Sequence, residues 1–199
     1  MNSISGLTLS KFLYQMKVIV GSLLVFTLTI FSCSQNNVKQ DKNLKKYFDE
    51  NKTEGCIALM NNATVKFTVH ILSRYRDSFY LPASTFKIIN SLIGLQTGKI
   101  SNDSMIIKWD GIKRSVEGWN KDLTMYEAFR VSAVPYYREV ARRIGKDTMQ
   151  YWLNQVKYGA KSDTDKIVIQ SAIDTFWLDN SLKITPDQQL GVVKQLYFN

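Results

Sequence analysis

After an apolar run near the N-terminus, apolar residues form two short segments and then recur at helical spacing over most of the chain. The two segments, residues 55–60 and 64–70, are separated by Asn-Asn-Ala and predict a β-hairpin whose first strand is buried. Residues 41–52, before the hairpin, predict a short amphipathic helix. Two strands followed by many helices are typical of an α+β fold.

The strongest helix signal lies in residues 82–87, Pro-Ala-Ser-Thr-Phe-Lys, and in the apolar pattern that follows them. Proline suits a helix start because its φ is fixed and it lacks an N–H group. From Phe86 the apolar residues recur at helical spacing, and Gly98 offers a stop. The same signals predict four more helices: from Asp122 or Thr124 to near Ser132, from Pro135 to Gly145, from Met149 to Lys157, and from a Thr-x-x-Gln capping box at Thr185 onward.

The apolar run near the N-terminus, residues 18–31, has 14 uncharged residues and follows Lys11 and Lys17. Its length fits the core of a signal peptide and falls short of the ~20 residues of a membrane span. The run ends in Ile-Phe-Ser-Cys-Ser, which resembles a bacterial lipobox whose cysteine, here Cys33, is lipidated after cleavage. An uncleaved membrane anchor is the alternative, and both interpretations place the domain outside the cytoplasm.

These features predict a chain of three parts. We expect a signal peptide over residues 1–33, a tether over the polar residues 34–40, and one domain over 41–199. The expected location is the periplasm, where a lipid on Cys33 would anchor the protein to a bacterial membrane.

The formal net charge is +9, and the basic residues are spread along the chain. No basic cluster is interleaved with aromatic residues, so the sequence favours a basic surface over nucleic-acid binding. One histidine and two distant cysteines cannot supply an ordinary zinc site, so we expect no metal. With Cys33 lipidated, Cys56 is left alone as a small buried residue. His70 ends a predicted strand and is interpreted as structural.

Ser84 and Lys87 lie three residues apart at a predicted helix start, so their side chains share one face. A serine beside a lysine in an apolar setting can act as a nucleophile without histidine. An ordinary lysine ammonium cannot take the serine proton, because forming the neutral amine costs about 4.6 kcal/mol at pH 7. Burial must therefore disfavour the cation. The alternative is a capping serine followed by a solvated lysine.

Further motifs follow Ser84 in order, and their combination is more specific than any one of them. They are Trp-Asp-Gly at 109–111, Trp-Asn-Lys-Asp at 119–122, Ser-Ala-Val-Pro-Tyr-Tyr at 132–137 and Phe-Trp-Leu at 176–178. From about residue 55 to 199 this order resembles the class D serine β-lactamases, the oxacillinases. The resemblance implies a penicillin-binding/β-lactamase-like fold, with an antiparallel sheet and a helical subdomain.

The sequence departs from the family pattern in three places, one of which is a stretch before Trp177 that is longer than usual. The family's Tyr-Gly-Asn reads Tyr-Gly-Ala at 158–160, and no Lys-Thr-Gly or Lys-Ser-Gly occurs. In the family that last motif lies on a C-terminal strand, supplies a cation for the substrate carboxylate and completes the oxyanion hole. Loss of one oxyanion donor costs roughly 2.7–4 kcal/mol. We therefore expect an enzyme truncated at its C-terminus, without the C-terminal strands and with an open sheet edge.

The resemblance implies a catalytic role for three residues. Ser84 would be the acylated nucleophile, and Lys87 would be the general base after its amine takes up carbon dioxide. Ser132 would relay a proton to the leaving nitrogen. No other cofactor is implied, and the alternative for Ser132 is a helix-terminal cap.

Four more residues are implied around them. Val134 would form an apolar wall over the lysine, and Trp177 would donate its indole N–H to the carboxylated lysine. An indole is only a donor, which suits an anion and does not suit an ammonium. Tyr158 and Gly159 would lie at the rim of the site. The alternatives are a core aromatic for Trp177 and a helix stop for Tyr158 and Gly159.

Three functions follow from these residues. The first is hydrolysis of β-lactam antibiotics through a serine acyl-enzyme, and the second is a penicillin-binding sensor that acylates without deacylation. The third is an inactive remnant. The first two take β-lactam small molecules as partners, with membrane contact through the N-terminal segment and no nucleic acid.

Overall fold

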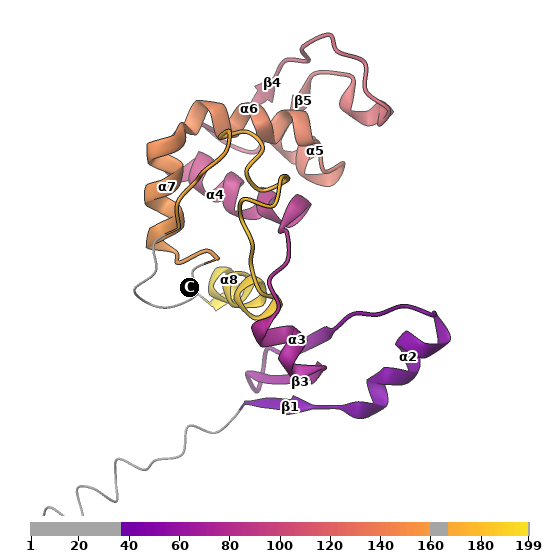
Figure 1. The fold of residues 1–199 in the computed structure, drawn as a ribbon. Coiled ribbons are helices and arrows are strands. Elements are labelled where there is room, and N and C mark those ends of the chain that lie inside the picture. Colours follow the sequence, from indigo (N-terminus) through magenta and orange to yellow (C-terminus); the bar gives the residue numbers. More distant parts are fainter. Residues whose placement is uncertain (1–36, 160–166, 199) are drawn as a thin grey trace, which may run out of the picture.

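The computed structural model describes residues 37–159 and 167–198, so the expected signal peptide and Cys33 lie outside the described residues. The fold is α+β, as predicted, with a small sheet at one end and a group of helices at the other (Figure 1). The strands are β1 (Val38–Gln40), β2 (Ile57–Asn61), β3 (Lys66–His70), β4 (Ile106–Ile107) and β5 (Leu123–Thr124). The α-helices are α2 (Lys45–Glu50), α3 (Leu72–Asp77), α4 (Lys87–Gln96), α5 (Met125–Arg130), α6 (Val134–Ile144), α7 (Lys146–Gln155) and α8 (Pro186–Phe198). Three short 3-10 helices are η1 (Lys42–Leu44), η2 (Ala83–Phe86) and η3 (Glu117–Trp119).

The main sheet has three strands in the order β1-β3-β2. The antiparallel β2–β3 pair, in which Ile57 faces His70, is the predicted hairpin. The tether predicted over 34–40 is wrong for its last three residues, because they form β1 and pair in parallel with β3. The sheet is therefore mixed instead of antiparallel. A strand can join a sheet through backbone hydrogen bonds alone, so the polar side chains of residues 38–40 do not predict a strand.

The strand predicted to be buried, β2, lies at an edge of this sheet. Its Ile57 is 39% exposed and its Leu59 is 53% exposed, so the prediction of burial is wrong. Cys56, just before β2, is only partly buried. Burial nevertheless raises the pKa of the Cys56 thiol. His70 is buried in β3 and stacks on Phe48 with ring centroids 4.9 Å apart, which agrees with a structural role.

The helical part encloses the main hydrophobic core. Helices α4 and α6 pack together, and a buried amide links them, because Asn90 donates to the Tyr137 carbonyl at 3.0 Å. Helices α4, α5, α6 and α8 match their predicted positions to within a few residues, whereas α7 begins earlier, at Lys146. The pattern missed the short helix α3 and the two-residue strands β4 and β5. Such short elements carry little periodic signal.

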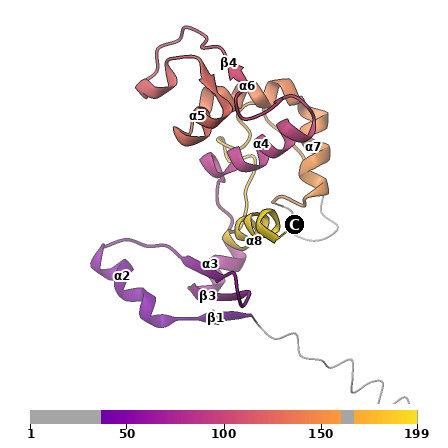
Figure 2. The ribbon, with the colours of Figure 1, turned by 180° about the vertical axis from the view of Figure 1, so that it is seen from behind.

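Helix α8 lies between the sheet and helices α4 to α7 in both views (Figures 1 and 2). Thr185 and Gln188 form the predicted capping box at its start, with reciprocal hydrogen bonds of 3.1 and 3.2 Å. On the sheet side, Lys194 Nζ lies 5.9 Å from the centroid of the Phe67 ring. On the helical side, Gln189 accepts a hydrogen bond from the Tyr158 hydroxyl. Helix α8 thus ties the two parts together. Among the described residues, none of the helices is long and apolar enough to cross a membrane.

Candidate active site

Ser84 lies in η2, the single turn that leads into α4, and its side chain is exposed. Thr85 fixes the start of this turn by donating its hydroxyl to the Pro82 carbonyl at 2.7 Å. Ala83 has a left-handed φ of 47°, which is uncommon for a residue with a Cβ. Its N–H donates to the Trp177 carbonyl at 3.2 Å. Residues distant in sequence therefore hold the backbone that presents Ser84.

Lys87 is the first residue of α4 and is partly buried. Its Nζ donates to the Phe129 carbonyl at 3.0 Å and lies 4.7 Å from the centroid of the Phe129 ring. The backbone N–H of Ser132 donates to the same carbonyl at 3.3 Å. The Lys87 amine and the Ser132 backbone thus meet at one oxygen atom. In the described residues, no hydrogen bond joins the side chains of Ser84, Lys87 and Ser132.

Ser132 occupies the turn between α5 and α6 with a left-handed φ of 51°. The Ala133 N–H closes this turn on the Ala128 carbonyl at 2.8 Å. The Trp119 indole N–H donates to the Val131 carbonyl at 3.0 Å, which fixes the residue just before Ser132. Val134 follows as the first, partly buried residue of α6. The turn is therefore held from the helix behind it and from the loop before it.

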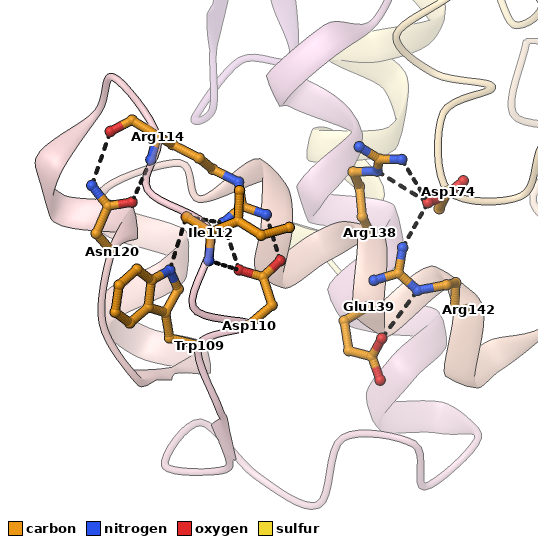
Figure 3. Close-up of polar contacts among 9 residues, drawn as sticks. All are labelled: Trp109, Asp110, Ile112, Arg114, Asn120, Arg138, Glu139, Arg142 and Asp174. Atoms are coloured by element: carbon orange, nitrogen blue, oxygen red, sulfur yellow. Dashed lines mark hydrogen bonds and ion pairs between the residues drawn. The ribbon is translucent and has the colours of Figure 1, made fainter.

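That loop contains the Trp-Asp-Gly and Trp-Asn-Lys-Asp motifs, and its polar residues bond mainly to one another (Figure 3). Asp110 accepts two hydrogen bonds from the Arg114 guanidinium, at 2.9 and 2.6 Å, which lowers the pKa of Asp110 to about 2. The Asn120 amide bonds to both the N–H and the carbonyl of Arg114. The Trp109 indole N–H donates to the Ile112 carbonyl. These motif residues shape the loop that carries Trp119.

An aromatic cluster lies beneath η2, with the fully buried Phe86 at its centre. The Trp177 ring stacks on the Phe86 ring with centroids 5.1 Å apart. The Phe176 ring lies edge-on to Phe86 at the same centroid distance. The Tyr158 ring also lies edge-on to Phe86, with ring centroids 5.7 Å apart. Trp177 is only 3% exposed, so its ring belongs to the core, while its backbone contacts Ala83.

Tyr158 and Gly159 lie just beyond α7, at the edge of this cluster. Tyr158 is fully buried, and its hydroxyl donates to Gln189 Oε1 at 2.8 Å. Burial raises the pKa of the Tyr158 phenol well above its ordinary value. Gly159 has a φ of 79°, and a Cβ there would lie 2.7 Å from the Lys183 carbonyl oxygen. This is the geometry of a helix stop, and Ala160 lies outside the described residues.

A cavity of about 490 Å3 adjoins η2 on the side of Thr85 and Gln189. It lies between the start of β2 and the start of α8, and its wall includes Cys56 and Arg74. In the described part of the chain, no group of three or more metal-ligating side chains is found.

Sequence reasoning missed several residues that build the site. A sequence motif cannot identify the Phe129 carbonyl as a hydrogen-bond acceptor, because every residue carries the same backbone carbonyl. Asp174 is a further case, since it binds Arg138 and Arg142 of α6 (Figure 3). The four-residue spacing of these arginines on a helix was a detectable signal.

Comparison with known proteins identifies the family to which the chain belongs. Residues 36–199 match the penicillin binding protein transpeptidase domain. The chain belongs to the class D β-lactamase branch of this family. It is 36% identical to β-lactamase OXA-10 of Pseudomonas aeruginosa over 82% of this chain and 59% of that protein. It is 35% identical to β-lactamase OXA-48 of Klebsiella pneumoniae over 81% of this chain and 58% of that protein.

Solved structures of the class D family agree with this assignment. The crystal structure of the class D β-lactamase YbXI from Nostoc matches with a TM-score of 0.71 and 40% sequence identity. The match covers 79% of this chain and 64% of that chain. The class D β-lactamase from Bacillus subtilis matches with the same TM-score and 35% identity. The chain thus spans about three fifths of the length of the curated relatives that it matches.

Proposed function

We propose that this chain reacts with β-lactams as a class D β-lactamase, through an acyl-enzyme on Ser84. Membership of the family supports the reaction type. The observation that carries the proposal is the convergence of the Lys87 amine and the Ser132 backbone on the Phe129 carbonyl, one helical turn from the exposed Ser84. A nucleophile, a base and a proton relay therefore come from two adjacent helix starts.

In this proposal the Ser84 oxygen attacks the carbonyl carbon of the ring, and its proton passes to the base. The ring C–N bond then breaks, and Ser132 transfers a proton to the leaving nitrogen. A water molecule later attacks the ester carbon and releases the Ser84 hydroxyl. The half-buried setting of Lys87 partly shields the amine from bulk solvent.

The surroundings of Lys87 fit uptake of carbon dioxide on its amine. Within the described residues no carboxylate pairs with Lys87, so forming the neutral amine breaks no ion pair. When bound, the group supplies an anionic base in place of an ammonium. Val134 would then form an apolar wall and Trp177 would be the donor-only partner of the anion.

The decisive experiment compares nitrocefin turnover, with added bicarbonate, by the wild type and by Ser84→Ala. We expect Ser84→Ala to lose all turnover, because the hydroxyl of the neighbouring Thr85 is already bonded to the Pro82 carbonyl. The matched control is Ser115→Ala, which removes another exposed serine and should keep the wild-type rate. Equal rates for Ser84→Ala and the wild type would contradict the proposal.

A penicillin sensor is the second candidate, and one contact favours it. The Lys87 Nζ donates to a carbonyl and lies over the Phe129 ring, and both contacts stabilise an ammonium. A lysine kept as a cation would support acylation poorly and deacylation not at all. Fluorescent penicillin that stays on Ser84 after washing would favour the sensor, and rapid loss of label would favour the hydrolase.

A further inference from the structure

The segment that carries Trp177 is fixed to α6 by a carboxylate three residues earlier in the chain. Asp174 Oδ2 accepts hydrogen bonds from Arg138 Nε at 3.0 Å, Arg138 Nη2 at 2.9 Å and Arg142 Nη1 at 2.6 Å (Figure 3). The Asp174 side chain is only 14% exposed. Hydrogen bonds between ionised groups are about twice as strong as neutral ones, so this is the strongest polar contact of the segment.

Asp174 binds two arginines of helix α6, and this helix begins at the candidate site. Helix α6 starts at Val134, two residues after Ser132, and Arg138 and Arg142 lie on its following turns. A rigid helix thus connects the turn at Ser132 to the ion cluster. Burial opposes ionisation of Asp174, but the two guanidiniums outweigh it and lower the pKa of the carboxyl.

Asp174 lies in a tight turn that leads to Trp177. The Phe176 and Thr175 N–H groups both donate to the Ala172 carbonyl, at 3.1 and 3.0 Å. Trp177 follows, with its ring on Phe86 and its carbonyl bonded to the N–H of Ala83, the neighbour of Ser84. Residues 174–177, the Trp177 segment, are therefore bound to α6 at one end and to η2 at the other.

We propose that Asp174 is a positioning residue that sets the place of the Trp177 indole relative to Lys87 by fixing the Trp177 segment to α6. The inference rests on the proposed function, in which Trp177 stabilises the carboxylated lysine. Release of Asp174 removes the ionic attachment to α6 and leaves the hydrogen bond at Ala83 and the packing of Trp177 on Phe86 to hold the segment. The indole then spends less time in place, and Lys87 holds carbon dioxide more weakly.

The test compares the wild type with Asp174→Asn, which keeps the shape of the side chain and removes its charge. Protein equilibrated with 13C-bicarbonate reports the lysine carbamate by NMR, and hydrogen exchange reports opening at the Ala83 amide. We expect the half-saturating bicarbonate concentration to rise about tenfold, as for a lost charged hydrogen bond, and Ala83 to exchange faster. If Asp174→Asn does not fold, Arg138→Lys carries the same expectation, because lysine cannot form the two-pronged contact.

The matched control is Glu139→Gln, which removes a carboxylate that binds Arg142 and Arg143 within α6. We expect it to match the wild type in both measurements. Unchanged carbamate affinity in Asp174→Asn would overturn the inference, because a merely structural role would slow turnover without altering the bicarbonate requirement. If the wild type itself gives no carbamate signal, the carboxylated base of the proposed function is refuted, and the inference falls with it.

Discussion

Left-handed backbone angles occur beside the candidate nucleophile and at the candidate proton relay itself. Ala83 has a φ of 47° and Ser132 a φ of 51°, although neither is a glycine. Each such residue costs about 1–2 kcal/mol, which the surrounding contacts must offset. The Trp177 carbonyl holds Ala83, and the Ala128 carbonyl closes the turn at Ser132. Neither angle is predictable from residue type, because alanine and serine prefer other conformations.

At Gly159 a Cβ atom would lie too close to the backbone of Lys183. We expect Gly159→Ala to lower the free energy of unfolding by at least ~1 kcal/mol more than Gly98→Ala, because its Cβ would press on the Lys183 carbonyl oxygen. Gly98 has a φ of 67° with nothing near its missing Cβ, so it isolates the cost of the angle alone. Urea unfolding of the three proteins measures both effects, and equal losses would contradict the expectation.

Among the elements, α5 decides where Ser132 lies, because its end leads directly into the turn. Its N-terminus is closed by a capping box in which Thr124 accepts the Glu127 N–H at 3.1 Å and Glu127 accepts the Thr124 N–H at 3.0 Å. The C-terminal end supplies the Phe129 carbonyl for Lys87 and Ser132. Stability of this short helix and geometry of the site are thus coupled.

We expect Thr124→Ala to reduce the free energy of unfolding by about 1 kcal/mol, because the Glu127 N–H loses its acceptor. The same change should slow acylation of Ser84 by loosening α5. Thr124→Ser is the control, since it keeps the hydroxyl and should stay within a few tenths of a kcal/mol of the wild type. Denaturant unfolding and penicillin labelling measure the two effects, and an equal loss in both variants would count against the cap.

At the level of the whole molecule, α8 joins the sheet to the helical part through Lys194 on one side and Gln189 on the other. A β-bridge between Tyr80 and Ile184 adds a second connection. The sheet itself buries little, since Ile57 and Leu59 of β2 are exposed. A small sheet with little buried apolar surface needs helices packed against it, and α3 and α8 supply that packing.

The proposed attachment to a membrane depends on Cys33. We expect the full chain to fractionate with bacterial membranes and Cys33→Ser to be lost from that fraction, because the variant lacks the thiol that takes the lipid. Cys56→Ser is the matched control, because it changes the only other cysteine and should keep the wild-type distribution. Immunoblots of the soluble and membrane fractions measure the outcome. Retention of Cys33→Ser in membranes would instead favour the uncleaved anchor.

The sequence by itself determined the class of the fold, helices α4, α5, α6 and α8, the β2–β3 hairpin and the family. These features depend on local periodicity, on caps such as Thr185 with Gln188, and on ordered motifs around Ser84. They are local because a helix turn or a cap involves residues only three or four positions apart.

Only the tertiary structure decided the rest. It made residues 38–40 a parallel strand, brought the Lys87 amine and the Ser132 backbone to the Phe129 carbonyl, and placed Asp174 between two arginines of α6. These contacts join backbone groups or residues more than 30 positions apart, as for Asp174 and Arg138. Backbone groups are the same in every residue, and long-range pairs depend on how the helices pack. A local sequence pattern therefore cannot predict these contacts.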